Sequence, residues 1–466
     1  MDELIAQLKA LLGEVGVLTG ADAQAKAQGI WLSMGTPAAV IRPATTAEVS
    51  AVLKLCHAAE IAIVPWGGKS GLVEGARADG LPALSLERMT RVEAIDPVTG
   101  TMTVEAGLPL QAACEAAEKA GMMFPLDLGA RGSATIGGNI STNAGGNRVI
   151  RYGMMRDMVL GLEAVLADGT VISAMNQMIK NNAGYDLKQL FIGTEGTLGV
   201  VTRAVLRLRP APRSQNTAFA AIDSLDGVAR FLRHMEAVLG GTLSAFEVMW
   251  DDFYRLVTKP PAAGRPPLAY GHPYYVLVES LGGDQDEDAA RFERALSAAL
   301  EAGQIADAVV AKNQSERAAM WGLRDDVGQI FQNAPIFTFD VSLRISDMES
   351  YVATVKRDLT AKWPDHTLML VAHLGDGNLH PVVGVGDDSP EARRAVEQII
   401  YRPLKACGGS ISAEHGIGLE KRPYLGLSRS PEEIALMRTL KQALDPKNIL
   451  NPGKVVDMAP VAQAAE

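Results

Sequence analysis

The chain has 466 residues, of which 47% are hydrophobic and 21% are charged, and its formal net charge is −10. This composition is typical of a globular protein with more than one domain. The acidic balance argues against a nucleic-acid-binding surface, and three scattered cysteines argue against a disulfide framework or an iron–sulfur site. No apolar run is long enough to span a bilayer. We therefore expect a soluble cytoplasmic protein, with peripheral attachment at the inner membrane as an alternative.

The first elements follow one another closely. Residues 1–16 place apolar side chains at helical spacing and predict an amphipathic helix rather than a signal peptide. Residues 38–43 and 61–65 are typical of short strands, and the helix between them begins with a capping box of Thr45 and Glu48. The three elements predict a parallel, right-handed β-α-β unit.

Two hairpins are predicted next. Residues 91–107 turn at Asp96–Gly100, and residues 165–172 turn at Asp168-Gly169. Residues 200–210 then predict a last strand, so a first α+β domain is expected to run to about residue 212.

The second half alternates helices and strands. Residues 225–239 and 287–303 predict helices, and residues 274–280 and 367–374 predict strands. The proline-rich residues 259–273 indicate a solvent-exposed connection. A second α+β domain is expected here.

The C-terminal part is predicted to be helical at first. Ser430, Pro431 and Glu433 begin a helix that ends near Leu444, and an alanine-rich tail follows at 459–466. The predicted domains are 1–212, 213–415 and 416–466, of which the last is a C-terminal helical segment that returns to the first domain.

Two glycine-rich segments are prominent in the first half. Residues 129–153 interleave glycine with serine, threonine and asparagine, and residues 66–72 repeat the pattern after a strand. Glycine permits close backbone approach, and successive N–H groups can hold an anion. Neither segment has P-loop or G-x-G-x-x-G spacing. They predict a cradle for a long cofactor that carries a pyrophosphate, with an ordinary polar loop as the alternative.

A histidine pair stands in VAHLGDGNLHPVV, residues 371–383. If Asp376-Gly377 forms a two-residue turn, His373 lies directly opposite His380, and the two imidazoles can share a metal such as Zn²⁺. A pair of structural histidines is the alternative.

Three further residues could complete such a site. Glu414 offers an anionic third ligand, and His415 is a candidate general base because an imidazole titrates near neutral pH. Alternatively, the two residues form an exposed helix N-terminus. Arg324 could bind a substrate carboxylate, or it could form a surface ion pair with Asp325 or Asp326.

Six motifs closely resemble the vanillyl-alcohol-oxidase-type flavoproteins, in the branch of D-lactate, glycolate and D-2-hydroxyglutarate dehydrogenases. They are PWGGKSGL, GSATIGGNISTNAGGNRVIRYG, FIGTEGTLGVVT, HLGDGNLH, AEHGIG and ILNPGK, and the resemblance runs from about residue 30 to 456. It implies an α+β fold: a two-part FAD-binding domain of the vanillyl-alcohol-oxidase type plus an α+β substrate (cap) domain with an antiparallel sheet.

The resemblance also implies site residues by motif position. His373, His380 and Glu414 would hold a divalent metal, Zn²⁺ or Mn²⁺, with His415 as catalytic base and Arg324 on the substrate carboxylate. The FAD-binding residues would be Pro65, Gly67, Gly68, Lys69, Ser70, Gly71, Leu72, Asp127, Ser133, Ala134, Thr135, Gly138, Asn139, Ser141, Thr142, Gly145, Glu195, Gly199, Val201 and Asn451. The first glycine loop has Lys69 and no histidine, so non-covalent FAD is expected.

Some positions depart from the D-2-hydroxyglutarate enzymes. Where those enzymes carry a lysine, a threonine and an asparagine, this chain has Thr338, Gly328 and Val382. Arg344 could replace the lost cation if it points into the site. The departures concern the far end of the substrate.

The expected reaction is oxidation of a D-2-hydroxy acid, such as D-lactate or D-2-hydroxyglutarate, to the 2-oxo acid by metal-assisted hydride transfer to flavin N5. A quinone, an electron-transfer flavoprotein or another carrier would accept the electrons, and a homodimer is expected. The alternatives are a non-catalytic flavin-binding subunit of a glycolate-oxidase-like complex, a flavoprotein oxidase, and a zinc hydrolase.

Overall fold

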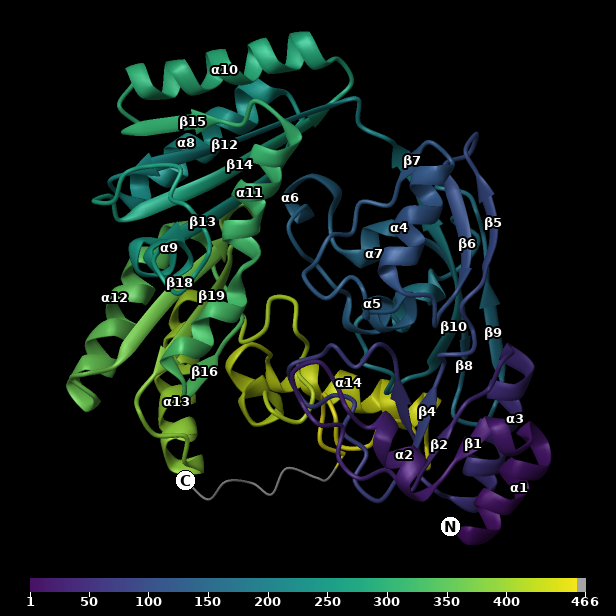
Figure 1. The fold of residues 1–466 in the computed structure, drawn as a ribbon. Helices are drawn as coiled ribbons and strands as arrows, with labels where there is room; N and C mark the ends of the chain where they lie inside the picture. Colours follow the sequence, from purple (N-terminus) through teal and green to yellow (C-terminus); the bar gives the residue numbers. More distant parts are fainter. Residues whose placement is uncertain (459–466) are drawn as a thin grey trace. The chain divides into compact units, whose positions relative to one another are not determined.

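The computed structural model describes residues 1–458, so the alanine-rich tail at 459–466 lies outside the described residues. The chain forms two compact units. The first unit contains Met1–Gly145, Met154–Ala211 and the chain from Glu414 onward, and the second contains Gly146–Gly153 and Pro212–Ala413. Both units are drawn in Figure 1. Within residues 1–458, every helix is too short or too polar to cross a membrane.

The first sheet of the first unit has four strands in the order β1-β2-β4-β3. The strands are β1 (Val17–Leu18), β2 (Ala39–Ile41), β3 (Val64–Trp66) and β4 (Pro82–Ser85), and the helices beside them are α1 (Asp2–Leu12), α2 (Gly20–Lys26) and α3 (Thr46–Ala59). The predicted strands β2 and β3 are indeed parallel, but β4 lies between them and pairs with both. Thr45 caps α3 by accepting a hydrogen bond from the backbone of Glu48, as predicted.

The second sheet of this unit has five antiparallel strands in the order β5-β6-β10-β8-β9. They are β5 (Val92–Asp96), β6 (Thr101–Glu105), β8 (Val159–Val165), β9 (Val171–Ala174) and β10 (Val200–Arg207). Both predicted hairpins are confirmed, because β5 pairs with β6 and β8 pairs with β9. The remaining α-helices and strands of the unit are α4 (Leu110–Lys119), β7 (Met122–Met123), α5 (Ile136–Thr142), α7 (Met155–Met158), β11 (Arg209–Pro210) and α14 (Pro431–Leu444).

The second unit is built on an eight-stranded sheet in the order β15-β12-β14-β13-β18-β19-β16, with β17 also pairing with β19. Every described pairing in it is antiparallel. The strands are β12 (Ser214–Ile222), β13 (Leu243–Trp250), β14 (Tyr274–Gly282), β15 (Asp307–Val310), β16 (Ile336–Thr338), β17 (Val341–Ser342), β18 (Thr367–His373) and β19 (Asn378–Gly384). The expected antiparallel sheet of the substrate domain is therefore present.

Besides its strands, the second unit contains α-helices. They are α6 (Val149–Tyr152), α8 (Leu225–Leu239), α9 (Asp251–Thr258), α10 (Gln285–Glu301), α11 (Gln314–Asp325), α12 (Ile345–Lys362) and α13 (Pro390–Cys407). The bounds of α8 are those predicted, and its buried residues, among them Val228, Phe231, Leu232 and Met235, recur at helical spacing. Phe231 packs on Phe246 of β13, with ring centroids 5.7 Å apart.

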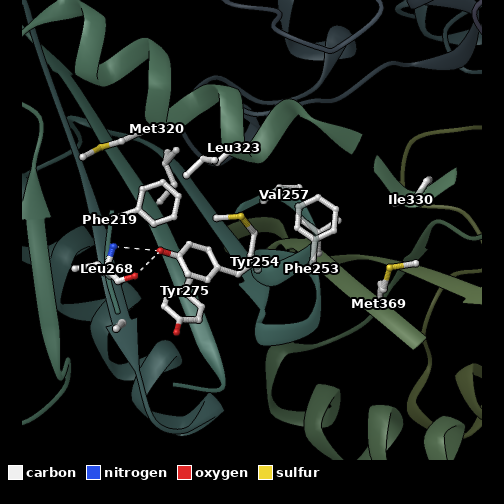
Figure 2. Packing of buried hydrophobic residues seen from close by; sticks show 14 of the residues in the cluster. Phe219, Phe253, Tyr254, Val257, Leu268, Tyr275, Met320, Leu323, Ile330 and Met369 are labelled. Carbon is white, nitrogen blue, oxygen red and sulfur yellow. Dashed lines mark hydrogen bonds between the residues drawn. The ribbon is translucent and has the colours of Figure 1, made fainter. Parts of the chain in front are cut away.

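The apolar cluster of Figure 2 joins α9, α11 and the sheet. Tyr254 stacks on Tyr275, with ring centroids 3.7 Å apart. The Tyr254 hydroxyl donates to the Leu268 carbonyl at 2.9 Å and accepts from the Leu268 amide at 3.1 Å. The proline-rich segment was expected to be exposed, and that expectation is wrong at Leu268, because this apolar side chain is 7% exposed and completes the cluster.

Candidate functional site

The two glycine-rich segments pack directly against each other. A Cβ added to Gly68 would overlap the carbonyl oxygen of Ser133, and one added to Gly67 would lie 2.9 Å from the Thr135 hydroxyl oxygen. Such contacts leave room only for glycine. The predicted cradle is therefore one continuous backbone surface made by residues 66–72 and 133–138.

The side chains of the cradle mostly stabilise its own backbone. The hydroxyls of Ser141 and Thr142 donate to carbonyls one helical turn earlier, and Thr135 caps α5. Lys69 has a φ of 54°, and its ammonium donates to the Lys26 carbonyl at 2.6 Å. Burial lowers the pKa of Lys69. Backbone N–H groups are therefore the main donors that this surface can offer to a phosphate.

Two buried amides fit a bound polar cofactor. Asn139 is 4% exposed, and its Nδ2 has no hydrogen-bond partner in the part of the chain that the structure describes. Asn451 is 1% exposed, and the same holds for its Oδ1, although its Nδ2 donates to the carbonyls of Gly75 and Glu195. A buried polar atom without a partner is costly, so both atoms favour a ligand that supplies one.

Glu195 connects this region to the AEHGIG segment. Its backbone is left-handed, and its carboxylate accepts hydrogen bonds from the amides of Ile417 at 2.6 Å and Gly418 at 2.9 Å. Burial raises the pKa of Glu195 above its ordinary value, although these two amides lower it. Among the other expected cofactor residues, Asp127 pairs with Arg131 at 3.2 Å.

The hairpin of the two histidines differs from the prediction. Leu374–Asp376 form a 3-10 turn, so the partner of His373 is Asn378 and the partner of His380 is Val371. The direct opposition of His373 and His380 is therefore wrong. The register differs by two residues, which keeps both side chains on one face of the sheet. Their ring centroids lie 5.3 Å apart.

His373 belongs to a buried group with Glu247 and Arg324. Its Nδ1 lies 2.8 Å from the Glu247 carboxylate, and its Nε2 lies 3.2 Å from Nη2 of Arg324. The Arg324 Nε donates to the Glu247 carboxylate at 2.7 Å. Arg324 is 5% exposed, so the alternative of a surface ion pair with an adjacent aspartate is wrong. Burial opposes ionisation of Glu247, but His373 and Arg324 together hold its pKa below the ordinary value.

Four other side chains converge on a possible metal position. Asp340, His380, Glu414 and His415 each offer one ligand atom, and these atoms lie within 4.8 Å of one another. Asp340 is fully buried, and its carboxylate accepts hydrogen bonds from the Ser412 hydroxyl and the Ala413 amide, both at 3.1 Å. Two imidazoles and two carboxylates are donors that suit Zn²⁺ or Mn²⁺.

Sequence reasoning named three members of this cluster and missed Asp340. The signal available was its place at the end of FTFD, the run that matches a motif of the resembling enzymes. His373, named as a ligand, lies outside the group of four and beside Arg324. Glu414 and His415 lie in a loop rather than at a helix start, so that alternative is wrong.

The positions that depart from the resembling enzymes can also be located. Thr338 is exposed and is the cross-strand partner of Val382, which lies two residues beyond His380 on the same strand. The Arg344 side chain is 73% exposed and pairs with Asp347 at 2.7 Å. Arg344 is therefore engaged on the surface at the start of α12 and is unsuited to the role of a substituted cation.

Comparison with known proteins agrees with the motifs. Residues 211–455 match the family model "FAD linked oxidases, C-terminal domain", and residues 37–174 match the model "FAD binding domain". A D-2-hydroxyglutarate dehydrogenase of Xanthomonas citri pv. viticola is 40% identical, covering 90% of this chain and 89% of the relative. The mitochondrial D-2-hydroxyglutarate dehydrogenase of Arabidopsis thaliana is 36% identical, with 97% and 81% covered. A putative mitochondrial D-lactate dehydrogenase of Schizosaccharomyces pombe is 37% identical, with 89% and 81% covered.

Solved structures support the fold. p-Cresol methylhydroxylase with substrate bound aligns with a TM-score of 0.77 at 19% identity, covering 98% of this chain and 97% of that one. Alkyldihydroxyacetonephosphate synthase aligns with a TM-score of 0.75 at 16% identity, with 97% and 86% covered. The expected α+β fold of the vanillyl-alcohol-oxidase type is confirmed. With its glycine cradle and both family models matched, the chain belongs to the FAD-linked oxidases, in the branch of the FAD-dependent D-2-hydroxy-acid dehydrogenases.

Proposed function

We propose that this chain oxidises a D-2-hydroxy acid to the 2-oxo acid, with non-covalently bound FAD and a divalent cation. The observation that carries the proposal is the cluster of Asp340, His380, Glu414 and His415. The cluster would hold the cation, and the glycine cradle would hold the FAD, which are the two groups that such a reaction needs. When bound, FAD supplies an acceptor for the hydride from C2 of the substrate.

Arg324 is proposed to bind the substrate carboxylate. A guanidinium has five N–H donors in a planar fork. The contacts described above use one on Glu247 and one on His373. Three donors remain for a carboxylate, while Glu247 keeps the fork in one orientation.

His415 is proposed to take the proton of the α-hydroxyl. Its imidazole can act as a base near neutral pH. A cation held by the neighbouring ligands would lower the pKa of a bound hydroxyl by several units, which makes the proton easier to remove. The ligands we assign are His380 and Glu414 with Asp340 as a third, and His373 as a further candidate.

The far end of the substrate is proposed to be short and uncharged, as in D-lactate. Thr338 and Val382 are cross-strand partners next to His380, and they stand where the resembling enzymes have a lysine and an asparagine. Arg344 pairs with Asp347 instead of replacing that lysine. A second carboxylate would thus have weaker recognition at this position than in those enzymes.

The test is an anaerobic flavin-bleaching screen of paired D- and L-2-hydroxy acids with the FAD-loaded full chain, with and without Zn²⁺ or Mn²⁺. We expect D-acids to bleach the flavin, D-lactate faster than D-2-hydroxyglutarate, and chelators to slow the reaction. Full activity in a metal-free preparation would remove the cation from the proposal.

Other outcomes identify the alternatives. Bound flavin that no 2-hydroxy acid bleaches would indicate a non-catalytic flavin-binding subunit, and hydrogen peroxide formed in air would indicate an oxidase. A colourless protein that cannot be reconstituted would favour a zinc hydrolase. The electron acceptor, the homodimer and the cytoplasmic location stay predictions.

A further inference from the structure

We propose that Glu247 is the positioning residue of this site, a buried carboxylate that sets the tautomer of His373 and the orientation of Arg324 at the same time. The inference rests on the proposed function for the roles of those two residues. It concerns only side chains of the second unit.

The sheet places Glu247 where it can do this. Glu247 and His373 are cross-strand partners of β13 and β18, so their side chains share one face of the sheet. Arg324 reaches them from the last turn of α11, which packs on the same sheet. The exposed fractions of the three residues are 1%, 5% and 6% for Glu247, Arg324 and His373. At that burial, each polar atom needs a partner.

The contacts define the protonation pattern. Arginine can only donate, so the 3.2 Å contact of its Nη2 makes Nε2 of His373 the acceptor. The proton of the neutral ring is then on Nδ1, which donates to the Glu247 carboxylate at 2.8 Å. The other side of the carboxylate accepts from the Arg324 Nε at 2.7 Å. The three side chains therefore form a ring of three hydrogen bonds, and in each of them the assigned donor faces an acceptor.

The pattern has a consequence for ligand binding. A neutral imidazole with the proton on Nδ1 has its one lone pair on Nε2, where it accepts from Arg324, so a cation bound there would replace that hydrogen bond and release the Arg324 N–H. A carboxylate that holds the far ring nitrogen is the usual partner of a metal-binding histidine. The same carboxylate fixes the fork that we assign to the substrate. Glu247 would therefore influence the affinity for the cation and the affinity for the substrate without contacting the cation or the substrate.

The decisive variant is Glu247→Gln, because glutamine keeps the size and loses one acceptor. Its amide N–H₂ must face either the Nδ1–H of His373 or the Nε–H of Arg324, and two donors repel each other. We expect Zn²⁺ affinity, measured by titration of the FAD-loaded full chain, to fall by about 10- to 100-fold. We also expect KM for the bleaching substrate to rise at least about tenfold, with a smaller change in kcat.

Nitrogen-15 NMR of the histidine rings gives a readout that does not depend on turnover. The wild-type spectrum should show His373 with its proton on Nδ1, and Glu247→Gln should change that signal. The control is Glu105→Gln, which breaks a buried carboxylate's pair with Arg91 in the first unit without contact to His373. It should leave Zn²⁺ affinity, KM and the His373 signal unchanged.

Two results would overturn the inference. One is an NMR spectrum in which the wild-type His373 carries its proton on Nε2. The other is a Glu247→Gln variant whose Zn²⁺ affinity and KM stay within twofold of the wild-type values. If that variant does not fold, Glu247→Asp keeps the charge and shortens the reach, and it should show the same losses in smaller measure. If no 2-hydroxy acid bleaches the wild-type flavin, the proposed function fails, while the NMR and Zn²⁺ measurements still decide the role of Glu247.

Discussion

At the scale of single residues, the buried Glu247 carboxylate of the second unit lies against a buried cation. The negative charge of Glu247 and the positive charge of Arg324 lie in contact, and His373 is neutral in the pattern of its hydrogen bonds. Removing one partner of such a buried pair typically costs about 3–5 kcal/mol, because the other charge is left uncompensated. The buried group of Glu247, Arg324 and His373 thus favours a single orientation of the arginine side chain.

His415 is the residue whose replacement tests the chemistry most directly. We expect His415→Ala to keep FAD and to lose about 10²- to 10⁴-fold in the rate of flavin reduction, because a general base contributes about that much. Stopped-flow reduction under nitrogen measures the rate, and flavin absorbance measures cofactor content. His366→Ala is the control, since His366 bonds to the Trp363 carbonyl outside the cluster. Normal reduction in His415→Ala would exclude His415 as the base.

Thr338 tests the proposal for the far end of the substrate. We expect Thr338→Lys to raise kcat/KM for D-2-hydroxyglutarate relative to D-lactate by at least about tenfold, which corresponds to about 1.4 kcal/mol of added discrimination. The reason is that a lysine opposite Val382 offers a cation to a second carboxylate. Thr338→Met adds length without charge and should leave the ratio unchanged. Equal ratios in the two variants would contradict the assignment.

At the scale of elements, the alternation of side chains along a strand explains why the two histidines of the hairpin still lie on one face of the sheet. The turn is two residues longer than predicted, so the cross-strand partner of His373 is Asn378 instead of His380. Both histidines still lie on the same face of the sheet. A change of one residue would have sent one imidazole to the opposite face. In the first unit, close packing of the backbone restricts which residue can stand at position 68, because a Cβ on Gly68 would overlap the Ser133 carbonyl.

Gly68→Ala is expected to disrupt the cofactor cradle. The new methyl group would overlap the Ser133 carbonyl, which is backbone and must move. Overpacking of this kind costs about 1–3 kcal/mol, and we expect FAD content after purification to fall at least several-fold. Gly129→Ala is the control, because a Cβ there meets nothing within 4 Å. Full FAD content in Gly68→Ala would refute the close packing of the two segments.

At the scale of the whole molecule, long-range contacts tie the C-terminal segment into the first unit. Lys441 is 3% exposed and donates to the Asp445 carboxylate at 2.5 Å and to the carbonyls of Thr197 and Leu450. Asp445 in turn accepts from the amides of Ile449 and Leu450. Burial lowers the pKa of Lys441, and the Asp445 carboxylate opposes that effect.

Asp445→Asn tests that attachment. The variant leaves the Lys441 ammonium buried without its counter-charge, so we expect a loss of about 3–5 kcal/mol in unfolding free energy. Urea unfolding followed by flavin release measures it. Asp226→Asn breaks a pair with the same helical spacing to Arg230, but both side chains are mostly exposed, and little change is expected. Equal stability of the two variants would show that the buried pair contributes no more than a surface pair.

The sequence by itself determined the elements whose signals are local. The helix at 225–239, the two hairpins of the first unit and the capping of α3 and α14 follow from periodicity, turn residues and caps a few positions apart. Its ordered motifs also determined the family, because the glycine segments must keep a backbone geometry that other residues do not adopt.

The tertiary structure alone decided which distant side chains meet. Glu247 stands 126 residues before its partner His373, and no local pattern marks it. Asp340 lies with His380, Glu414 and His415, and it accepts hydrogen bonds from Ser412 and Ala413, which are far from it in the sequence. Leu268 is hydrogen-bonded to Tyr254 and is buried in the apolar cluster of Figure 2. The physical reason is that strand register and helix packing are set by the sum of many contacts across the whole core, whereas sequence spacing reports only neighbours along the chain.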